Sequence, residues 1–207
     1  MKFCLRDRNQ GMVDAWKFYF NDNLDFHISC GDIFDDGPHM TVDAIVSPAN
    51  SFGFMDGGID YVYSEFLGWG MSEDLRKAIH VDHGGELLVG DAVVVDIRDS
   101  NPKTPIPYLI SAPTMRVPLD IRGTVNAYLA FRAVLRASKK YDIKSILCPG
   151  LGTAVGKLPH KVAALQMHAA YRQFTRPEVM DVLGRAHARH HFMLNPEAYD
   201  MTLKAHG

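Results

Sequence analysis

Short apolar runs that alternate with longer amphipathic segments constrain the fold of this chain more than any other feature. Residues 42–46 and 145–148 are almost continuously apolar, which favours buried strands, the first of them buried on both faces. Residues 92–97 are rich in β-branched side chains, which also favours a strand. Residues 124–140 carry an apolar stripe at a spacing of four, as a helix with one buried face requires. We therefore expect an α/β fold with a largely parallel sheet and helices on both of its faces.

The same pattern places the other elements along the chain. Strands are predicted at residues 1–5, 25–30, 42–46, 92–97, 108–112 and 145–148, and helices at 12–20, 59–67, 72–80, 124–140, 160–174 and 179–189. The aromatic content of residues 12–20 leaves a strand open as the alternative there. Because the chain has 207 residues, it can bury a core as a single domain without disulfides or a structural metal.

Composition narrows the partners that this chain is expected to have. The formal net charge is -2, which argues against a nucleic-acid binder, because affinity for a phosphate backbone needs a surplus of cations. No apolar run approaches the ~18 residues that span a bilayer, so no membrane contact is expected. The first residues reach charged side chains too early for a signal peptide. Cys4, Cys30 and Cys148 form no C-x-x-C pair and each lies in or beside an apolar stretch, so we expect buried, reduced thiols in a cytoplasmic protein.

Two glycine-rich loops each follow a predicted strand. The first is S-P-A-N-S-F-G-F-M-D-G-G-I-D at residues 47–60, and the second is P-G-L-G-T-A-V-G-K-L-P at residues 149–159. In open α/β sheets, ligands bind beyond the carboxyl ends of the strands. Glycine lets successive backbone N–H groups form a concave anion site beside a helix N-terminus. The two loops therefore predict a diphosphate site, with tight strand-to-helix turns as the structural alternative.

The second loop matches neither of two familiar phosphate motifs. A P-loop needs G-x-x-x-x-G-K-[ST], but only three residues separate Gly152 from the Gly156–Lys157 pair where the motif has four, and Leu158 replaces the hydroxyl residue. A dinucleotide fingerprint needs G-x-G-x-x-G, and here the third glycine, Gly156, comes one position late. We therefore do not expect a P-loop or a Rossmann dinucleotide site.

Four segments, in this order, resemble the macro domain, a family of ADP-ribose-binding modules. Gly31-Asp32-Ile33 is similar to the family's G-D-I, and V-D-A-I-V-S-P-A-N at residues 42–50 to its V-D-A-I-V-N-x-A-N. Gly57-Gly58-Ile59-Asp60 is similar to the end of its G-G-G-V-D loop, and residues 150–156 to its second glycine loop. The resemblance covers about residues 26–174, between an N-terminal strand and helix at 1–25 and a C-terminal extension at 175–207. It implies a three-layer α/β/α sandwich around a central mixed, largely parallel sheet.

The resemblance also implies a role for each matching residue. Asp32 would accept a hydrogen bond from the adenine amino group, because a carboxylate is an acceptor only. Asn50 would bind the hydroxyls of the distal ribose, and Asp60 would position or activate a water molecule. The implied ligand-binding set is Asp32, Ile33, Asn50, Gly57, Gly58, Ile59, Gly150, Gly152, Thr153, Ala154, Val155 and Gly156, with Asn50 and Asp60 as the catalytic pair. An aromatic ring over the adenine is also expected, but the sequence does not single one out.

Three activities are consistent with these residues. The favoured one is hydrolysis at the anomeric carbon of the distal ribose, which would release ADP-ribose from a modified side chain. The spacing of Asn50 and Asp60 matches the hydrolytic branch of the family. The alternatives are a non-catalytic ADP-ribose reader and a phosphatase acting on ADP-ribose 1''-phosphate. No compact set of metal ligands lies near the loops, so we expect no metal or other cofactor, and ADP-ribose or an ADP-ribosylated protein as the partner.

Several positions depart from the family pattern. Ser47 stands where the hydrolytic branch often has asparagine, Met55 and Asp56 where further glycines are common, and Ala154 where a glycine is frequent. These departures affect the catalytic branch and the fit of the distal ribose more than the binding of ADP-ribose.

A histidine cluster lies near the C-terminus. His187 and His191 are four residues apart, as two metal ligands on one helix face would be, and His190 lies beside them. No glutamate lies between them and no third ligand is evident, so we expect a solvated helix face.

Overall fold

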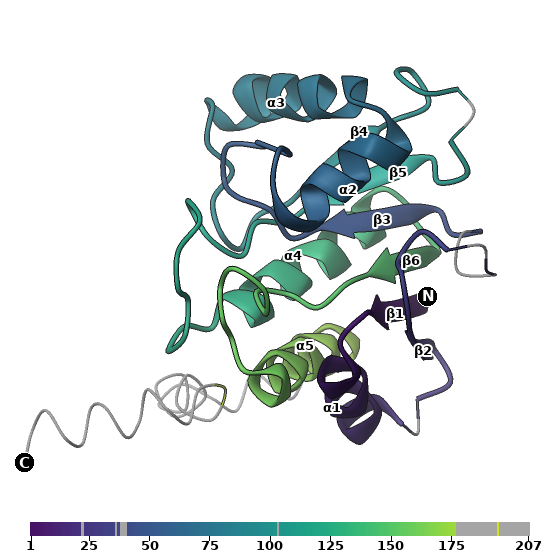
Figure 1. Ribbon diagram of the computed structural model, residues 1–207, viewed down its shortest axis with the longest axis vertical. Helices are drawn as coiled ribbons and strands as arrows, with labels where there is room; N and C mark the ends of the chain where they lie inside the picture. The colour runs from purple at the N-terminus through teal and green to yellow at the C-terminus, as the bar shows by residue number, and fades with distance from the viewer. Residues whose placement is uncertain (22, 36, 38–40, 103, 177–193, 195–207) are drawn as a thin grey trace, which may run out of the picture.

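The computed structural model describes residues 1–176 and 194, apart from residues 22, 36, 38–40 and 103. These residues contain a six-stranded sheet (Figure 1). Its strand order is β2 (Phe26–Cys30), β1 (Lys2–Asp7), β6 (Ser145–Cys148), β3 (Ala44–Ser47), β5 (Tyr108–Ser111) and β4 (Val93–Asp96). Neighbouring strands are parallel, except that β4 is antiparallel to β5. The mixed, largely parallel sheet that the sequence predicts is confirmed.

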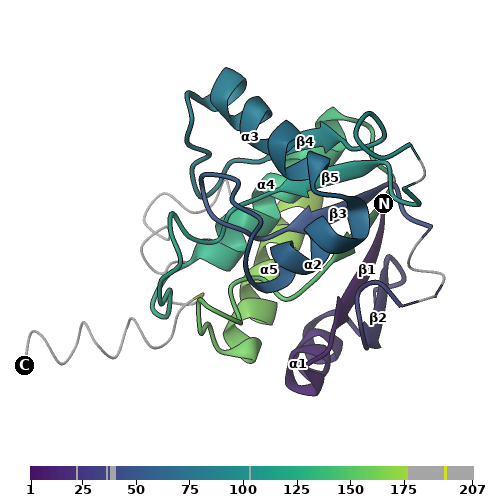
Figure 2. The same cartoon turned by 45° about the horizontal axis from the view of Figure 1, so that its top comes forward.

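Helices cover both faces of the sheet and complete a three-layer sandwich (Figures 1 and 2). One face carries α1 (Gln10–Phe20), α4 (Asn126–Lys140) and α5 (His160–Thr175), and the other carries α2 (Gly58–Leu67) and α3 (Gly70–His83). Successive residues of the central strands supply the two cores. Val46 and Ile146 belong to the first core, and Ile45 and Leu147 to the second. Burial on both faces explains why these strands are almost continuously apolar.

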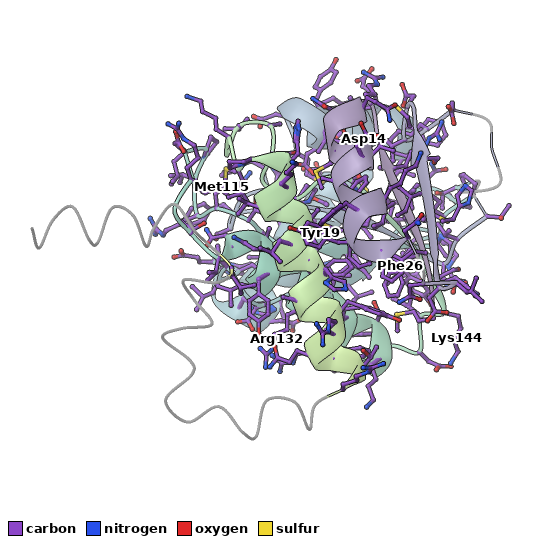
Figure 3. The ribbon with its side chains drawn as sticks, turned by 90° about the horizontal axis from the view of Figure 1, so that it is seen from below. Asp14, Tyr19, Phe26, Met115, Arg132 and Lys144 are labelled. Atoms are coloured by element: carbon purple, nitrogen blue, oxygen red, sulfur yellow. The ribbon has the colours of Figure 1, made fainter. Side chains whose placement is uncertain are left out.

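Residues 12–20, for which the sequence left a strand open, belong to the helix α1. The Asn9 side chain caps its first turn by accepting a hydrogen bond from the backbone N–H of Gly11 at 2.9 Å. Trp16 is fully buried, and Tyr19 points toward α5, where its ring centre lies 5.9 Å from that of His168 (Figure 3). The aromatic side chains thus pack one helix against another, and the strand alternative is wrong.

The other predicted elements lie within a few residues of the observed ones. The largest differences are at α3, which begins at Gly70 rather than at residue 72 and ends at His83, where Gly84 takes a left-handed φ of 63°. The helix predicted at residues 179–189 and the cluster of His187, His190 and His191 lie outside the described residues. Among the helices that the structure describes, none is long and apolar enough to cross a membrane.

The carboxyl ends of three adjacent parallel strands define the edge of the sheet where a ligand can bind. β1, β6 and β3 lie next to one another, so their last residues, Asp7, Cys148 and Ser47, are at the same edge. The chain leaves β1 for α1 on one face and leaves β3 for α2 on the opposite face. Such a change of side opens a crevice between the two connections. Residues 1–25, which lie outside the family motifs, thus supply a strand that the crevice needs.

Candidate ligand-binding site

A cavity of about 500 Å³ lies at this edge of the sheet. Its volume is within the range of small-molecule and cofactor sites. Every residue that the sequence singled out lines it: Asp32, Ile33, Asn50, Gly57, Gly58, Ile59, Asp60, Gly150, Gly152, Thr153, Ala154, Val155 and Gly156. The structure therefore brings together segments that are more than 100 residues apart in the sequence. Their roles in binding a ligand stay predictions.

The second glycine loop presents a row of backbone donors. The N–H groups of residues 152–156 donate no hydrogen bond to any residue that the structure describes. The carbonyl groups of the same loop are used internally, because Gly152 O accepts from the Leu158 N–H and Ala154 O from the Lys157 N–H, both at 3.0 Å. Five consecutive unpaired N–H groups beside a cavity form an anion-binding surface that needs no cationic side chain.

Two glycines of this loop have no room for a side chain. A Cβ atom on Gly156 would lie 2.5 Å from the carbonyl oxygen of Gly152, and one on Gly152 would lie 2.6 Å from Cδ1 of Ile121. Gly152 also has a φ of 72°, which glycine adopts without strain. These residues are therefore required by the loop's own geometry, and the departure at Ala154, which is exposed, leaves that geometry intact.

Three helices begin at the wall of the cavity. Asn9 caps α1, Gly57 and Gly58 open α2, and His160 is the first residue of α5, and all four line the cavity. The N-terminus of a helix carries about half a positive charge and leaves its first N–H groups without partners in the helix. The cavity therefore attracts anions, although Asp7, Asp32, Asp56 and Asp60 also line it.

Asp32 lies at one end of the cavity in a network that sequence analysis did not foresee. Its Oδ1 accepts from the backbone N–H of Phe34 at 3.0 Å, and its Oδ2 accepts from the guanidinium group of Arg8. The hydrogen bond from the Phe34 backbone and the hydrogen bond from the Arg8 side chain lower the pKa of Asp32 from its usual value. Arg6, which is buried, donates to the Asp32 carbonyl at 2.6 Å. Ile33 lies beside this carboxylate and adds an apolar wall.

Asp60 lies in the first turn of α2 and is 7% exposed. Ser47, at the end of β3, donates its hydroxyl to Asp60 Oδ1 at 2.6 Å. Burial raises the pKa of Asp60 to about 7, and the hydrogen bond from Ser47 opposes that rise. A carboxyl group with a pKa near neutrality can take up and release a proton at physiological pH, as general acid–base chemistry requires.

Asn50 uses its carboxamide within the first glycine loop. Its Nδ2 donates to the carbonyl of Phe54 at 2.8 Å, and its Oδ1 accepts from the N–H of Phe52 at 3.0 Å. The loop is also tied to the segment after β5, since the Thr114 N–H donates to Ala49 O at 3.3 Å. Asn50 thus shapes the cavity wall, and its contact with a ribose stays a prediction.

Several lining residues carried no motif in the sequence. They are Arg6 and Asp7 at the end of β1, Arg8 and Asn9 directly after it, Phe54 and Asp56 in the first loop, and Thr114, Met115 and Pro118 after β5. Phe54 supplies the one phenyl ring among the described lining residues. The charged run that ends β1 was the available signal, because polar residues at the carboxyl end of a strand are typical of sites in this fold class.

Within the described part of the chain, no group of three or more histidine, cysteine, aspartate or glutamate side chains could hold a metal ion. Cys148 is buried, which raises the pKa of its thiol, Cys4 is half-buried, and Cys30 is exposed. The expectation of buried thiols is therefore correct for Cys148 and wrong for Cys30, which lies at the end of the edge strand β2.

Comparisons with known proteins identify the family. The family model of the Macro domain matches residues 46–167. An uncharacterised protein of Aquifex aeolicus is 35% identical over 135 residues, which is 65% of this chain and 76% of that protein. A second uncharacterised protein, from Aeropyrum pernix, is 33% identical over 144 residues, 69% of this chain and 67% of that protein.

Solved structures share the fold at lower identity. The macrodomain of Mycobacterium tuberculosis DarG has a TM-score of 0.57 at 21% identity, covering 70% of this chain and 88% of its own. The Oceanobacillus iheyensis macrodomain with ADP has a TM-score of 0.56 at 20% identity, covering 71% and 80%. The Trypanosoma brucei macrodomain in complex with ADP-ribose has a TM-score of 0.52 at 21% identity, covering 68% and 56%. Since the family model matches more than half of its residues, this chain belongs to the macro domain family.

Proposed function

We propose that this chain binds ADP-ribose in the cavity at the ends of β1, β6 and β3. The observation that carries the proposal is that residues 152–156 line a cavity where three helices begin and that their N–H groups donate to no described residue. These groups suit a diphosphate, because they donate several hydrogen bonds in a fixed concave arrangement. Macrodomains solved with ADP and with ADP-ribose share this fold, which supports a ligand of that class.

The rest of the ligand follows from the residues on either side of this row. The base would lie at the Asp32 and Ile33 end, where a carboxylate accepts hydrogen bonds beside an apolar wall. The distal ribose would lie toward Asn50 and the residues 57–59 that open α2. A sugar on the far side of the diphosphate is needed to reach that part of the cavity, which is why we propose ADP-ribose rather than AMP.

We further propose that the protein hydrolyses ADP-ribosyl adducts. Water would add to the anomeric carbon of the distal ribose as the bond to the modified side chain breaks, and the released side-chain atom would take up a proton. Asp60 would accept the proton of the attacking water, and its pKa of about 7 supports this role. Its position in the first turn of α2, where it lines the cavity together with residues 57–59, also supports this role.

Titration calorimetry with ADP-ribose, NAD, ATP and AMP tests the binding proposal. We expect ADP-ribose to bind most tightly and AMP to bind weakly, because AMP lacks both the diphosphate and the distal ribose. No heat of binding for ADP-ribose would overturn the proposal. An ADP-ribosylated protein and ADP-ribose 1''-phosphate then separate the activities. Release of ADP-ribose supports the hydrolase, release of inorganic phosphate from the second compound supports the phosphatase, and binding without either product leaves a reader.

A further inference from the structure

Two arginines contact Asp32, and they differ in burial. The Arg6 side chain is 10% exposed and donates Nε to the Asp32 carbonyl at 2.6 Å, so it fixes the backbone there. The Arg8 side chain is 69% exposed and donates Nη2 to the Asp32 carboxylate. An exposed ion pair contributes at most about 1 kcal/mol, so Arg8 can direct its donors to a ligand at little cost while Arg6 keeps Asp32 in place.

The Arg8–Asp32 pair offers both hydrogen-bond donors and hydrogen-bond acceptors to a ligand in the cavity. From the described residues, Asp32 accepts one hydrogen bond at each carboxylate oxygen, from Phe34 and from Arg8, and each oxygen can accept a second. The remaining guanidinium N–H groups of Arg8 have no partner among the described residues. A bound base would therefore meet an acceptor and a planar donor side by side, in a cavity that the apolar Ile33 and Val62 also line.

The donors and acceptors along the edge of a purine ring can be matched to those of Asp32 and Arg8. A 6-aminopurine offers its amino group to Asp32 and its N7 acceptor to Arg8. A 6-oxopurine offers O6 and N7, which match the two parallel donors of a guanidinium group, and its N1–H can donate to Asp32. With a carboxylate alone, the 6-oxo group would face another acceptor and be rejected.

We propose that Arg8 sets the base selectivity of the site, so that the cavity takes 6-oxopurine as well as 6-aminopurine diphosphate sugars. This inference rests on the proposed function, since it places the base at Asp32. It adds a selectivity residue directly after β1, outside the segments that match the family motifs.

Calorimetry of the full chain with ADP-ribose and with IDP-ribose, in which hypoxanthine replaces adenine, tests the role of Arg8. The wild-type chain is expected to bind the two within about tenfold of each other. Arg8→Met keeps an apolar stem but removes all the donors. It is expected to weaken IDP-ribose about tenfold more than ADP-ribose, which is the scale for losing a bidentate contact to a purine.

Arg98→Met is the matched control. Arg98 is 54% exposed and its guanidinium group pairs with the carboxylate of Asp96, as that of Arg8 pairs with Asp32, but Arg98 does not line the cavity. This variant should leave both affinities unchanged. The inference is overturned if the ratio of the affinities for ADP-ribose and IDP-ribose is the same in Arg8→Met as in the wild type. This holds whether both affinities fall together or neither changes. A wild-type chain that binds ADP-ribose but not IDP-ribose also overturns it while the proposed function stands, and one that binds neither overturns both.

Discussion

Ser47 donates its hydroxyl to Oδ1 of Asp60 at 2.6 Å, and the two residues join the end of β3 to the first turn of α2. Both side chains are buried, and burial raises the pKa of Asp60 from 3.8 to about 7. The folded protein therefore keeps a proton on this carboxyl group at pH values where the unfolded chain has already lost it. Because the folded and unfolded states then bind different numbers of protons, the free energy of unfolding depends on pH.

The free energy of unfolding is therefore expected to contain a pH-dependent contribution from Asp60. Between about pH 4 and pH 7 the folded state binds the extra proton, so this contribution falls as the pH rises, by about 1.4 kcal/mol per pH unit, and levels off above pH 7. Asp60→Asn removes the titration but keeps an oxygen that can accept from Ser47. Urea unfolding at pH 5 and at pH 7 should show a smaller difference for the variant than for the wild type, and equal differences would contradict the pKa.

The same carboxyl group is expected to matter more for turnover than for affinity. If Asp60 accepts the proton of the attacking water, Asp60→Asn should lower kcat by about 100- to 10,000-fold and change the Kd for ADP-ribose by only a few fold. Single-turnover release of ADP-ribose from a modified protein gives the first quantity, and calorimetry gives the second. A variant with normal turnover would remove Asp60 from the mechanism, and one that loses affinity to the same extent would make it a binding residue.

The hydrogen bond from Ser47 is expected to keep the pKa of Asp60 lower than burial alone would make it. The Ser47 hydroxyl donates to the ionised carboxylate, so Ser47→Ala should raise the pKa of Asp60 further, because desolvation is then less opposed. In the enzyme, the ascending limb of the pH profile of kcat/KM should move to higher pH. Carbon-13 NMR of the Asp60 carboxyl group measures the same shift in the protein without ligand. If the pKa of Asp60 in Ser47→Ala equals the pKa in the wild type, the hydrogen bond from Ser47 does not affect ionisation.

The sequence predicts those parts of the fold and of the site that depend on residues close to one another in the chain. The strand Ser145–Cys148 and the glycine loops on either side of the cavity follow from residues next to one another in the chain. Helix α1 was ambiguous because its aromatic side chains suit a strand as well as a helix packed on α5. Its cap at Asn9 was the local signal that separates the two.

The contacts that could not be predicted from the sequence are determined by how the strands pair. Arg6 meets Asp32 because β1 and β2 pair in parallel with Arg6 opposite Ser29, and no pattern within either strand encodes that register. Met115 reaches the cavity because β5 pairs with β3, which brings the segment after β5 beside Asn50. The family motifs predicted which residues gather at the site, but the hydrogen-bond partners of Asn50 and Asp32 depend on loop geometry and strand register that no motif encodes.

Asp32 and Asp96 provide a matched pair for the base subsite. Each accepts from the backbone N–H two residues ahead and from an arginine, and their side chains are 37% and 36% exposed, but only Asp32 lines the cavity. Asp32→Ala is expected to weaken ADP-ribose binding by about 1–3 kcal/mol, the scale for a hydrogen bond to a charged group. Asp96→Ala should leave binding unchanged. Equal affinities in the two variants would show that Asp32 has only the local structural role that both share.

The backbone donors of the second glycine loop are best tested at an exposed position. A side chain at Gly152 would collide with Ile121, so a loss of binding there could reflect a distorted loop. Ala154 is exposed and lines the cavity, which makes Ala154→Glu compatible with the fold. The added carboxylate should repel the diphosphate and weaken ADP-ribose binding by about tenfold at low salt.

Ala154→Gln separates this repulsion from the effect of size. It adds a side chain of nearly the same shape without the charge, so it should bind ADP-ribose at least several fold more tightly than Ala154→Glu. Raising the salt concentration to 1 M shortens the screening length to about 3 Å and should bring the two affinities together. If the two variants bind equally well at low salt, no phosphate lies near residues 152–156. The unpaired N–H groups would then be solvated by water alone, and the diphosphate would have to lie elsewhere in the cavity.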